Sequence, residues 1–85
     1  MNWEIKNEKL STEIHFKSVS ELATFIGLIA ELIDKENHHP DFIISHTHLK
    51  IELFTYDRNQ ITEKDQSMSL QLSKCYENYL NSLNK

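Results

Sequence analysis

The spacing of the apolar residues changes at residue 18, and this change constrains the fold of the 85-residue chain more than any other feature. Before it, alternation predicts a strand with one buried face, and the positions on that face are Leu10, Thr12, Ile14 and Phe16. After it, helical spacing predicts an amphipathic helix, with an apolar face of Leu22, Phe25, Ile26, Ile29, Leu32 and Ile33. Ser18-Val19-Ser20-Glu21 lies between them and matches the Ser-x-x-Glu capping box that opens a helix.

The remaining segments repeat this alternation of strands and helix. Residues 3–5 alternate like residues 10–16, which predicts a hairpin turning at residues 7–9. We expect the helix to end near residue 36 and a second antiparallel pair, residues 42–44 and 49–53, to turn around residues 46–48. After the polar connection at residues 57–60, Thr62-Glu63-Lys64-Asp65 opens a second helix. Its expected buried stripe is Met68, Leu72, Cys75, Tyr76, Tyr79 and Leu83.

The predicted element order is strand, strand, helix, strand, strand, helix. Two one-sided helices and a one-sided antiparallel sheet pack most simply as two layers. We therefore predict an α+β two-layer sandwich, with a four-stranded antiparallel sheet and two helices on one face, in a single domain spanning residues 1–85. Because so short a chain buries a small core, association with further copies would help to stabilise it.

Composition excludes several classes of function. The formal net charge is −4 and the lysines are scattered singly, so no basic stripe is present to bind a nucleic acid. No apolar run reaches the roughly 20 residues that span a bilayer. The start of the chain has neither the basic residues nor the apolar centre of a signal peptide, and Cys75 is alone. We therefore expect a cytoplasmic protein that binds neither nucleic acid nor membrane.

The dipeptide His38-His39, followed by Pro40, is the main chemical feature. Histidine titrates near neutral pH and serves as a general acid or base. Pro40 disfavours the helical region for His39, so we expect the pair just past the end of the first helix, with both rings facing a cleft. The alternative is that the pair merely ends this helix, because cationic side chains are favoured at helix C-termini.

The segment from Asp34 to Asp41 resembles the signature of the pterin-4a-carbinolamine dehydratases, in which an acidic residue stands four positions before His-His-Pro. Trp3 resembles the early tryptophan of that family. Residues 49–55 resemble its hydrophobic strand that ends in Thr-His, and residues 61–65 resemble the start of its second helix. The chain is therefore similar to this family over nearly its whole length.

The resemblance implies the removal of water from 4a-hydroxytetrahydropterins to give quinonoid dihydropterin, which recycles the cofactor of aromatic amino acid hydroxylases. It implies that His38 and His39 are catalytic, that Asp34 or Asp65 orients an imidazole, and that Pro40 belongs to the same site. It also implies a homodimer or homotetramer that needs no metal and no cofactor. One family member also serves as the dimerisation partner of a transcription factor.

Two positions depart from the family pattern. Tyr56 follows Thr55 where the family usually has a third histidine, and an unperturbed tyrosine, with a pKa near 10, is a poor proton shuttle at neutral pH. Lys64 stands where an arginine is common, which keeps the charge and loses the bidentate geometry. The alternative function is therefore a catalytically impaired module for pterin binding or protein interaction, in which Tyr56 contributes to binding.

Further alternatives concern His46, His48 and Asp65. His46 and His48 form a His-x-His on one strand side, a spacing that can bind a metal, but no third or fourth ligand is evident from the sequence, and we expect turn residues. A weaker alternative is a metal-binding protein that uses His38, His39, His46 and His48 together. His46 or His48 could also compensate for the missing third histidine. Asp65 could be no more than a helix cap.

Overall fold

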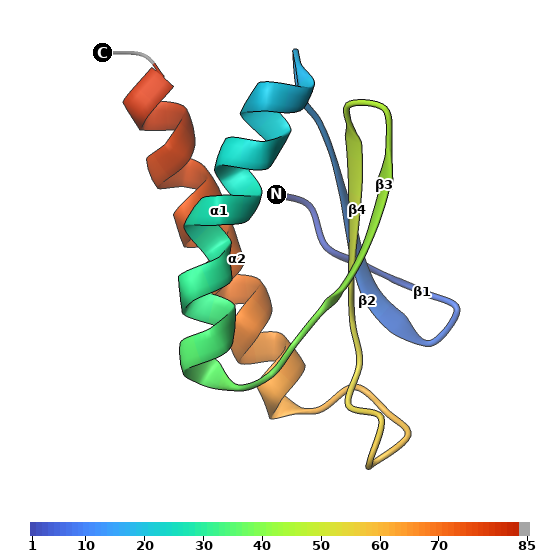
Figure 1. Cartoon of the computed structure of the whole chain (residues 1–85). Helices are drawn as coiled ribbons and strands as arrows, with labels where there is room; N and C mark the ends of the chain where they lie inside the picture. The colour runs from blue at the N-terminus through green and yellow to red at the C-terminus, as the bar shows by residue number, and fades with distance from the viewer. Residues whose placement is uncertain (84–85) are drawn as a thin grey trace.

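The computed structural model describes residues 1–83 and contains four strands and two helices in that part of the chain. The elements are β1 (Glu4–Lys6), β2 (Lys9–His15), α1 (Val19–Glu36), β3 (Asp41–Ser45), β4 (His48–Leu53) and α2 (Glu63–Leu83). Both helices lie on one face of a single antiparallel sheet (Figure 1). This arrangement confirms the predicted α+β sandwich and the order of its elements.

The strands lie in the sheet in the order β1-β2-β4-β3, so the two hairpins join through their second strands. Ile14 of β2 pairs with Leu49 of β4, and Thr12 pairs with Ile51. This register brings the apolar positions of both central strands to the face that the helices cover. β3 is left at an edge of the sheet, and each of its five residues is exposed.

The predicted turns and helix start are present. Asn7 and Glu8 both have positive φ, 50° and 68°, as a tight two-residue hairpin turn requires. The hydroxyl of Ser18 accepts the backbone N–H of Glu21 at 3.1 Å. The carboxylate of Glu21 in turn accepts the N–H of Lys17, also at 3.1 Å. The return bond of the capping box therefore reaches the residue that precedes the N-cap Ser18.

The core lies between the sheet and the helices. Its fully buried apolar side chains come from β4 and both helices and are Phe25, Ile29, Leu49, Ile51, Leu53, Met68 and Leu72. The prediction was wrong for Leu83, whose side chain is 52% exposed. Leu83 lies in the last turn of α2 and lines an open hollow beside Tyr79, outside the core.

Tyr79 closes one end of the core with other aromatic rings. Its ring centroid lies 5.6 Å from that of Phe25 and 6.2 Å from that of Phe16. Burial raises the pKa of Tyr79, and no group within residues 1–83 hydrogen-bonds to its hydroxyl.

None of the helices within residues 1–83 combines the length and the apolar character that crossing a membrane would require.

Candidate active site

His38 is held in place by a contact between the end of α1 and the start of α2. Asn37 ends α1 in the left-handed conformation, with φ 55°, and its N–H caps the carbonyl of Ile33 at 3.0 Å. The chain then turns toward α2, where Nε2 of His38 lies 2.6 Å from Oδ1 of Asp65. The side chains of His38 and Asp65 are 16% and 0% exposed. Residues 27 positions apart therefore form a pair shielded from water.

The second carboxylate oxygen of Asp65 is also fully used. Oδ2 accepts the hydroxyl of Thr55 at 2.7 Å and the backbone N–H of Thr62 at 2.9 Å. The hydroxyl of Thr62 lies 2.6 Å from that of Thr55 and accepts the N–H of Lys64 at 3.3 Å. Asp65 is therefore a helix cap and a partner of His38 at once, because each of its oxygens meets a different element.

This network determines which nitrogen of His38 is available. A carboxylate accepts hydrogen bonds and donates none, so Nε2 of His38 carries the proton in the contact with Asp65. In a neutral imidazole, Nδ1 then has the free lone pair. His38 is thus oriented as a proton acceptor through Nδ1.

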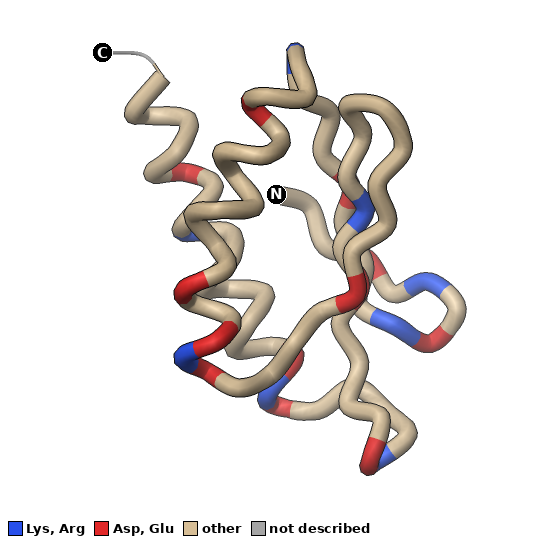
Figure 2. The backbone as a smooth tube through the Cα atoms, in the orientation of Figure 1, with Lys and Arg blue, Asp and Glu red and all other residues tan. Residues whose placement is uncertain are grey.

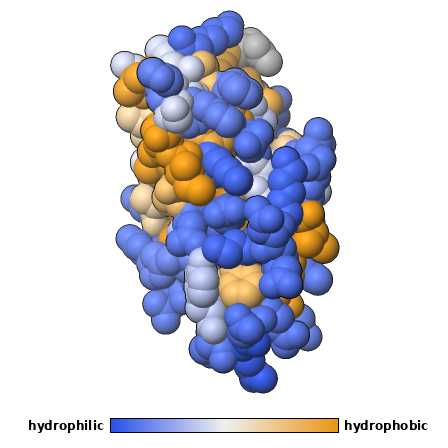
Figure 3. Space-filling view, turned by 90° about the vertical axis from the view of Figure 1, so that its right-hand side faces the viewer, coloured by the Kyte–Doolittle hydropathy of each residue, from blue (hydrophilic) through white to orange (hydrophobic). Residues whose placement is uncertain are grey.

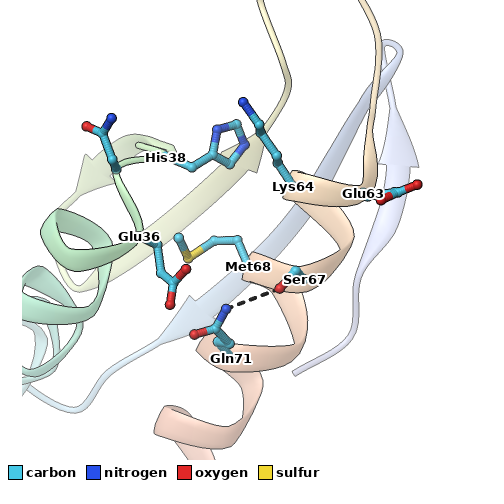
Figure 4. Close-up of a pocket in the computed structure, with 8 residues that line it drawn as sticks. Glu36, His38, Glu63, Lys64, Ser67, Met68 and Gln71 are labelled. Carbon is cyan, nitrogen blue, oxygen red and sulfur yellow. Dashed lines mark hydrogen bonds between the residues drawn. The ribbon is translucent and has the colours of Figure 1, made fainter.

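A cavity of about 360 Å³ opens beside His38, between the end of α1 and the first turns of α2. Its lining residues are Glu36, Asn37, His38, Glu63, Lys64, Ser67, Met68 and Gln71. In Figure 4 the His38 ring reaches toward Lys64 at one end, while Glu36 and Gln71 lie toward the other end, with Met68 between them. Figure 2 shows acidic and basic residues close together where α1 ends and α2 begins. The cavity is therefore lined by one oriented imidazole, by the apolar side chain of Met68 and by charged side chains.

His39 and Asp34 lie outside this cavity. The side chain of His39 is 59% exposed, and its Nε2 lies 3.4 Å from Oδ1 of Asp34, which is exposed as well. The two neighbouring imidazoles thus point to different surroundings, and the expectation that both rings face one cleft holds for His38 alone. Pro40 separates this exposed pair from β3.

Tyr56 is engaged elsewhere. Its hydroxyl donates to Oδ2 of Asp41 at 2.5 Å and accepts from Nζ of Lys9 at 2.9 Å. The bond to Tyr56 raises the pKa of the Lys9 ammonium. Thr55 points inward and donates to Asp65, whereas the next residue, Tyr56, is exposed. None of the hydrogen bonds within residues 1–83 joins Tyr56 to His38. Tyr56 therefore links β3 to the first hairpin.

Thr55, Thr62 and Met68 were missed as site residues by sequence reasoning. Thr62-x-x-Asp65 matches a capping box in which aspartate replaces glutamate, so Thr62 could have been found from the pattern. Thr55 is a polar residue at an inward position of the strand pattern, which is a weaker signal. Met68 was predicted as core, and its side chain forms the core and the cavity floor together.

His46 and His48 do not share a strand side. His46 lies in the β3–β4 turn, as expected, with φ 56°. His48 begins β4 and stacks on His15 with ring centroids 4.2 Å apart. Within residues 1–83, the histidine, cysteine, aspartate and glutamate side chains form no group of three that could hold a metal ion.

Comparison with known proteins agrees with this fold. The family described as pterin 4 alpha carbinolamine dehydratase matches residues 1–75. A Prochlorococcus marinus protein named "putative pterin-4-alpha-carbinolamine dehydratase" is 31% identical over 75 residues, which are 88% of this chain and 78% of the relative. A Sulfolobus acidocaldarius protein of the same name is 31% identical over 72 residues, 85% of this chain and 79% of the relative.

Two solved structures share the fold. The crystal structure of a transcriptional coactivator/pterin dehydratase from Brucella melitensis matches with a TM-score of 0.78 and 24% identity over 86% of this chain and 80% of that one. A pterin dehydratase-like RuBisCO assembly factor of the alpha-carboxysome matches with a TM-score of 0.68 and 17% identity over 87% and 86%. From the match over residues 1–75 and the identities above 30%, the chain belongs to the pterin 4 alpha carbinolamine dehydratase family.

Proposed function

We propose that this protein dehydrates 4a-hydroxytetrahydropterins to quinonoid dihydropterins in the cytoplasm. The observation that carries the proposal is the His38–Asp65 pair, which orients an imidazole that lines a cavity of about 360 Å³. General acid–base catalysis needs such a positioned group, and the reaction needs no metal or redox cofactor. Family membership supplies the substrate class.

The reaction requires two proton transfers. Nδ1 of His38 accepts the proton of pterin N5, the N5 electron pair forms the C4a=N5 bond, and the C4a–O bond breaks. The departing hydroxyl takes a proton and leaves as water, so the net change is the loss of one water molecule. We assign this second proton to His39, whose ring lies outside the cavity, 3.4 Å from Asp34, so that the transfer runs through an intervening water. Pro40 restrains the backbone of His39, and Asp65 orients His38.

The contacts of Tyr56 favour the alternative, a catalytically impaired member that binds a pterin or a protein partner. Tyr56 stands where the family usually has its third histidine, and it is bonded to Lys9 and Asp41. Non-catalytic roles are known in similar folds, since one structural neighbour is described as a coactivator and another as a RuBisCO assembly factor.

A dehydration assay on wild type, Tyr56→His and Tyr56→Phe separates the two functions. We expect wild type to accelerate the reaction, and Tyr56→His to raise kcat about tenfold or more, because one added general acid or base contributes up to about 10²–10⁴-fold. Tyr56→Phe is the control for simple loss of the hydroxyl bonds to Asp41 and Lys9. A wild type that equals the spontaneous rate, beside an active Tyr56→His, would establish the impaired module instead.

We also propose that two copies pair through β3. Its free edge carries the exposed apolar run Phe42-Ile43-Ile44, without the lysine or proline that protects sheet edges. Figure 3 shows such apolar areas on an otherwise mainly hydrophilic side of the molecule. Antiparallel pairing of two β3 strands about Ile43 sets Phe42 of one copy opposite Ile44 of the other, so the contact is self-complementary. The other edge strand, β1, is three residues long and carries Glu4 and Lys6.

Ile43→Lys tests this interface, because antiparallel pairing about residue 43 would set two lysines directly opposite each other, and like charges in that position destabilise a strand pair. We expect sedimentation to show that wild type is a dimer or a larger assembly and that Ile43→Lys shifts it toward the monomer. Ile5→Lys on β1 is the matched control, since Ile5 is the exposed isoleucine of the opposite edge. An Ile43→Lys protein that keeps the wild-type mass would refute the interface.

A further inference from the structure

We infer that Thr55 is a positioning residue for His38: its hydroxyl proton limits the attraction of the Asp65 carboxylate for the imidazole and so keeps His38 a base at neutral pH. The inference rests on the proposed use of His38 as a proton acceptor. It adds a residue that acts through Asp65 and has no need to touch the substrate.

The hydrogen bonds around Asp65 can run in one direction only. A carboxylate accepts and does not donate, so the Thr55 hydroxyl gives its single proton to Oδ2 of Asp65 across 2.7 Å. The contact of 2.6 Å between the Thr55 and Thr62 hydroxyls must then use the proton of Thr62. The hydroxyl oxygen of Thr62 accepts the backbone N–H of Lys64 at 3.3 Å. The chain of donors therefore runs from the first turn of α2 through both threonines to Asp65.

The backbone holds Thr55 in place independently of its hydroxyl. Its N–H donates to the carbonyl of Gln60 at 3.0 Å, and its carbonyl accepts the N–H of Arg58 at 3.1 Å. The bridge between Thr55 and Gln60 closes the connection that leads from β4 to α2. Thr55 is 3% exposed, so water does not compete for its hydroxyl proton. Loss of the hydroxyl should therefore remove one proton from the network without moving the end of the strand.

The position of Asp65 makes such a proton necessary for a base. A buried carboxylate favours the protonated form of a neighbouring imidazole, and an imidazolium has a proton on both nitrogens and cannot accept another. Asp65 is fully buried and lies 2.6 Å from Nε2 of His38. Its charge is also stabilised by two other donors, the Thr55 hydroxyl and the Thr62 backbone. These two donors reduce the share of the charge that acts on His38.

Other charged groups face His38 from the cavity that it lines. They are Glu36 at the end of α1 and Glu63 and Lys64 at the start of α2. All three are exposed, so water and salt screen their effect on the imidazole. The bond from Thr55 to Asp65 is shielded from both, which makes it the stronger influence on His38.

Thr55→Val tests the inference, because valine keeps the branched shape and lacks the hydroxyl. The measurements are an NMR titration of the His38 imidazole nitrogens and the pH profile of kcat/KM. We expect the midpoint of the His38 titration to move to higher pH by about 0.5–1 unit, the effect of one hydrogen bond. The acid limb of the profile should move with it, because protonated His38 cannot accept the substrate proton.

Two further variants separate positioning from a merely structural role. Thr55→Ser keeps the hydroxyl and should restore the wild-type midpoint. Thr12→Val is the matched control, because Thr12 is also 3% exposed and its hydroxyl donates to the carbonyl of Asn2, likewise at 2.7 Å. It lies outside the network around Asp65, so it should lower stability and leave the titration of His38 unchanged.

The NMR titration needs no turnover, so the inference and the proposed reaction can fail separately. An upward shift in Thr55→Val alone supports the inference even if wild type does not accelerate dehydration. An active wild type beside a folded Thr55→Val protein with an unchanged His38 midpoint overturns the inference and leaves the reaction standing. An equal shift in Thr12→Val overturns it as well. If Thr55→Val does not fold, Thr62→Val removes the donor to Thr55 and should give a smaller shift in the same direction, and an unchanged midpoint there overturns the inference.

Discussion

Replacement of His38 by glutamine is expected to lower kcat for carbinolamine dehydration on the order of 10²–10⁴-fold, the usual contribution of one general acid or base. Glutamine can keep a hydrogen bond to Asp65 but cannot take up the pterin proton at neutral pH. In the wild type, the 2.6 Å bond to Asp65 keeps the imidazole proton on Nε2, so Nδ1 is the atom that accepts the pterin proton. Stopped-flow measurement of kcat and KM checks the prediction, and KM should change much less than kcat.

His15→Gln is the matched control for His38→Gln. His15 is an exposed histidine of β2 that stacks on His48, and it does not line the cavity beside His38. The control should retain wild-type kcat. If His38→Gln also retains it while folded, catalysis does not use this imidazole, and the exposed His39–Asp34 pair would have to supply both proton transfers.

Asp65→Asn is expected to lower both the free energy of unfolding and kcat. An asparagine has one acceptor and one donor group, whereas Asp65 accepts from His38, Thr55 and the Thr62 backbone. Whichever way the amide is turned, its N–H₂ faces a nitrogen that wild type uses as a donor. We expect a loss of about 1–3 kcal/mol, the cost of one unsatisfied buried polar group. If the amide N–H₂ faces His38, the imidazole proton moves to Nδ1, and kcat should fall on the order of 10²-fold or more.

Chemical denaturation and the pH dependence of kcat together test this role. A purely structural effect would lower stability and leave the pH profile of the folded enzyme unchanged, whereas a positioning role also changes the profile. Asp57→Asn is the control, because Asp57 is an exposed aspartate of the connection that precedes α2 and is outside the network around His38. Equal effects of the two substitutions on kcat would contradict the role assigned to Asp65.

Most of the fold could be predicted because its signals are local. The alternation before residue 18 and the capping contact of Ser18 with Glu21 need only neighbouring residues, and both are present in the structure. Leu83 was assigned to the core by its spacing alone, yet a spacing pattern cannot tell where the sheet beneath a helix ends. Strand order was not predictable from periodicity, because alternation indicates which face is buried and says nothing about which strand lies alongside.

The sequence named His38 and Asp65, but it could not predict the geometry that brings them together. Pro40 located the histidine pair past the helix end, as the structure has it. Which ring turns inward depends on the carboxylate it meets, and Asp65 meets His38 from 27 positions away. The network of Thr55 and Thr62 around Asp65 likewise requires α2 to begin against the end of β4.

The sequence by itself determined the two periodicities, the turns and caps between them, the His-His-Pro motif and the family that this motif indicates. Tertiary structure alone decided that His38 is buried against Asp65 while His39 lies in solvent with Asp34, and that Tyr56 bonds to Lys9, 47 positions away. The physical reason is the sequence separation over which each kind of interaction acts. Backbone preferences and side-chain spacing act over a few residues, whereas the proton position on an imidazole depends on whichever distant group packing brings within hydrogen-bond distance.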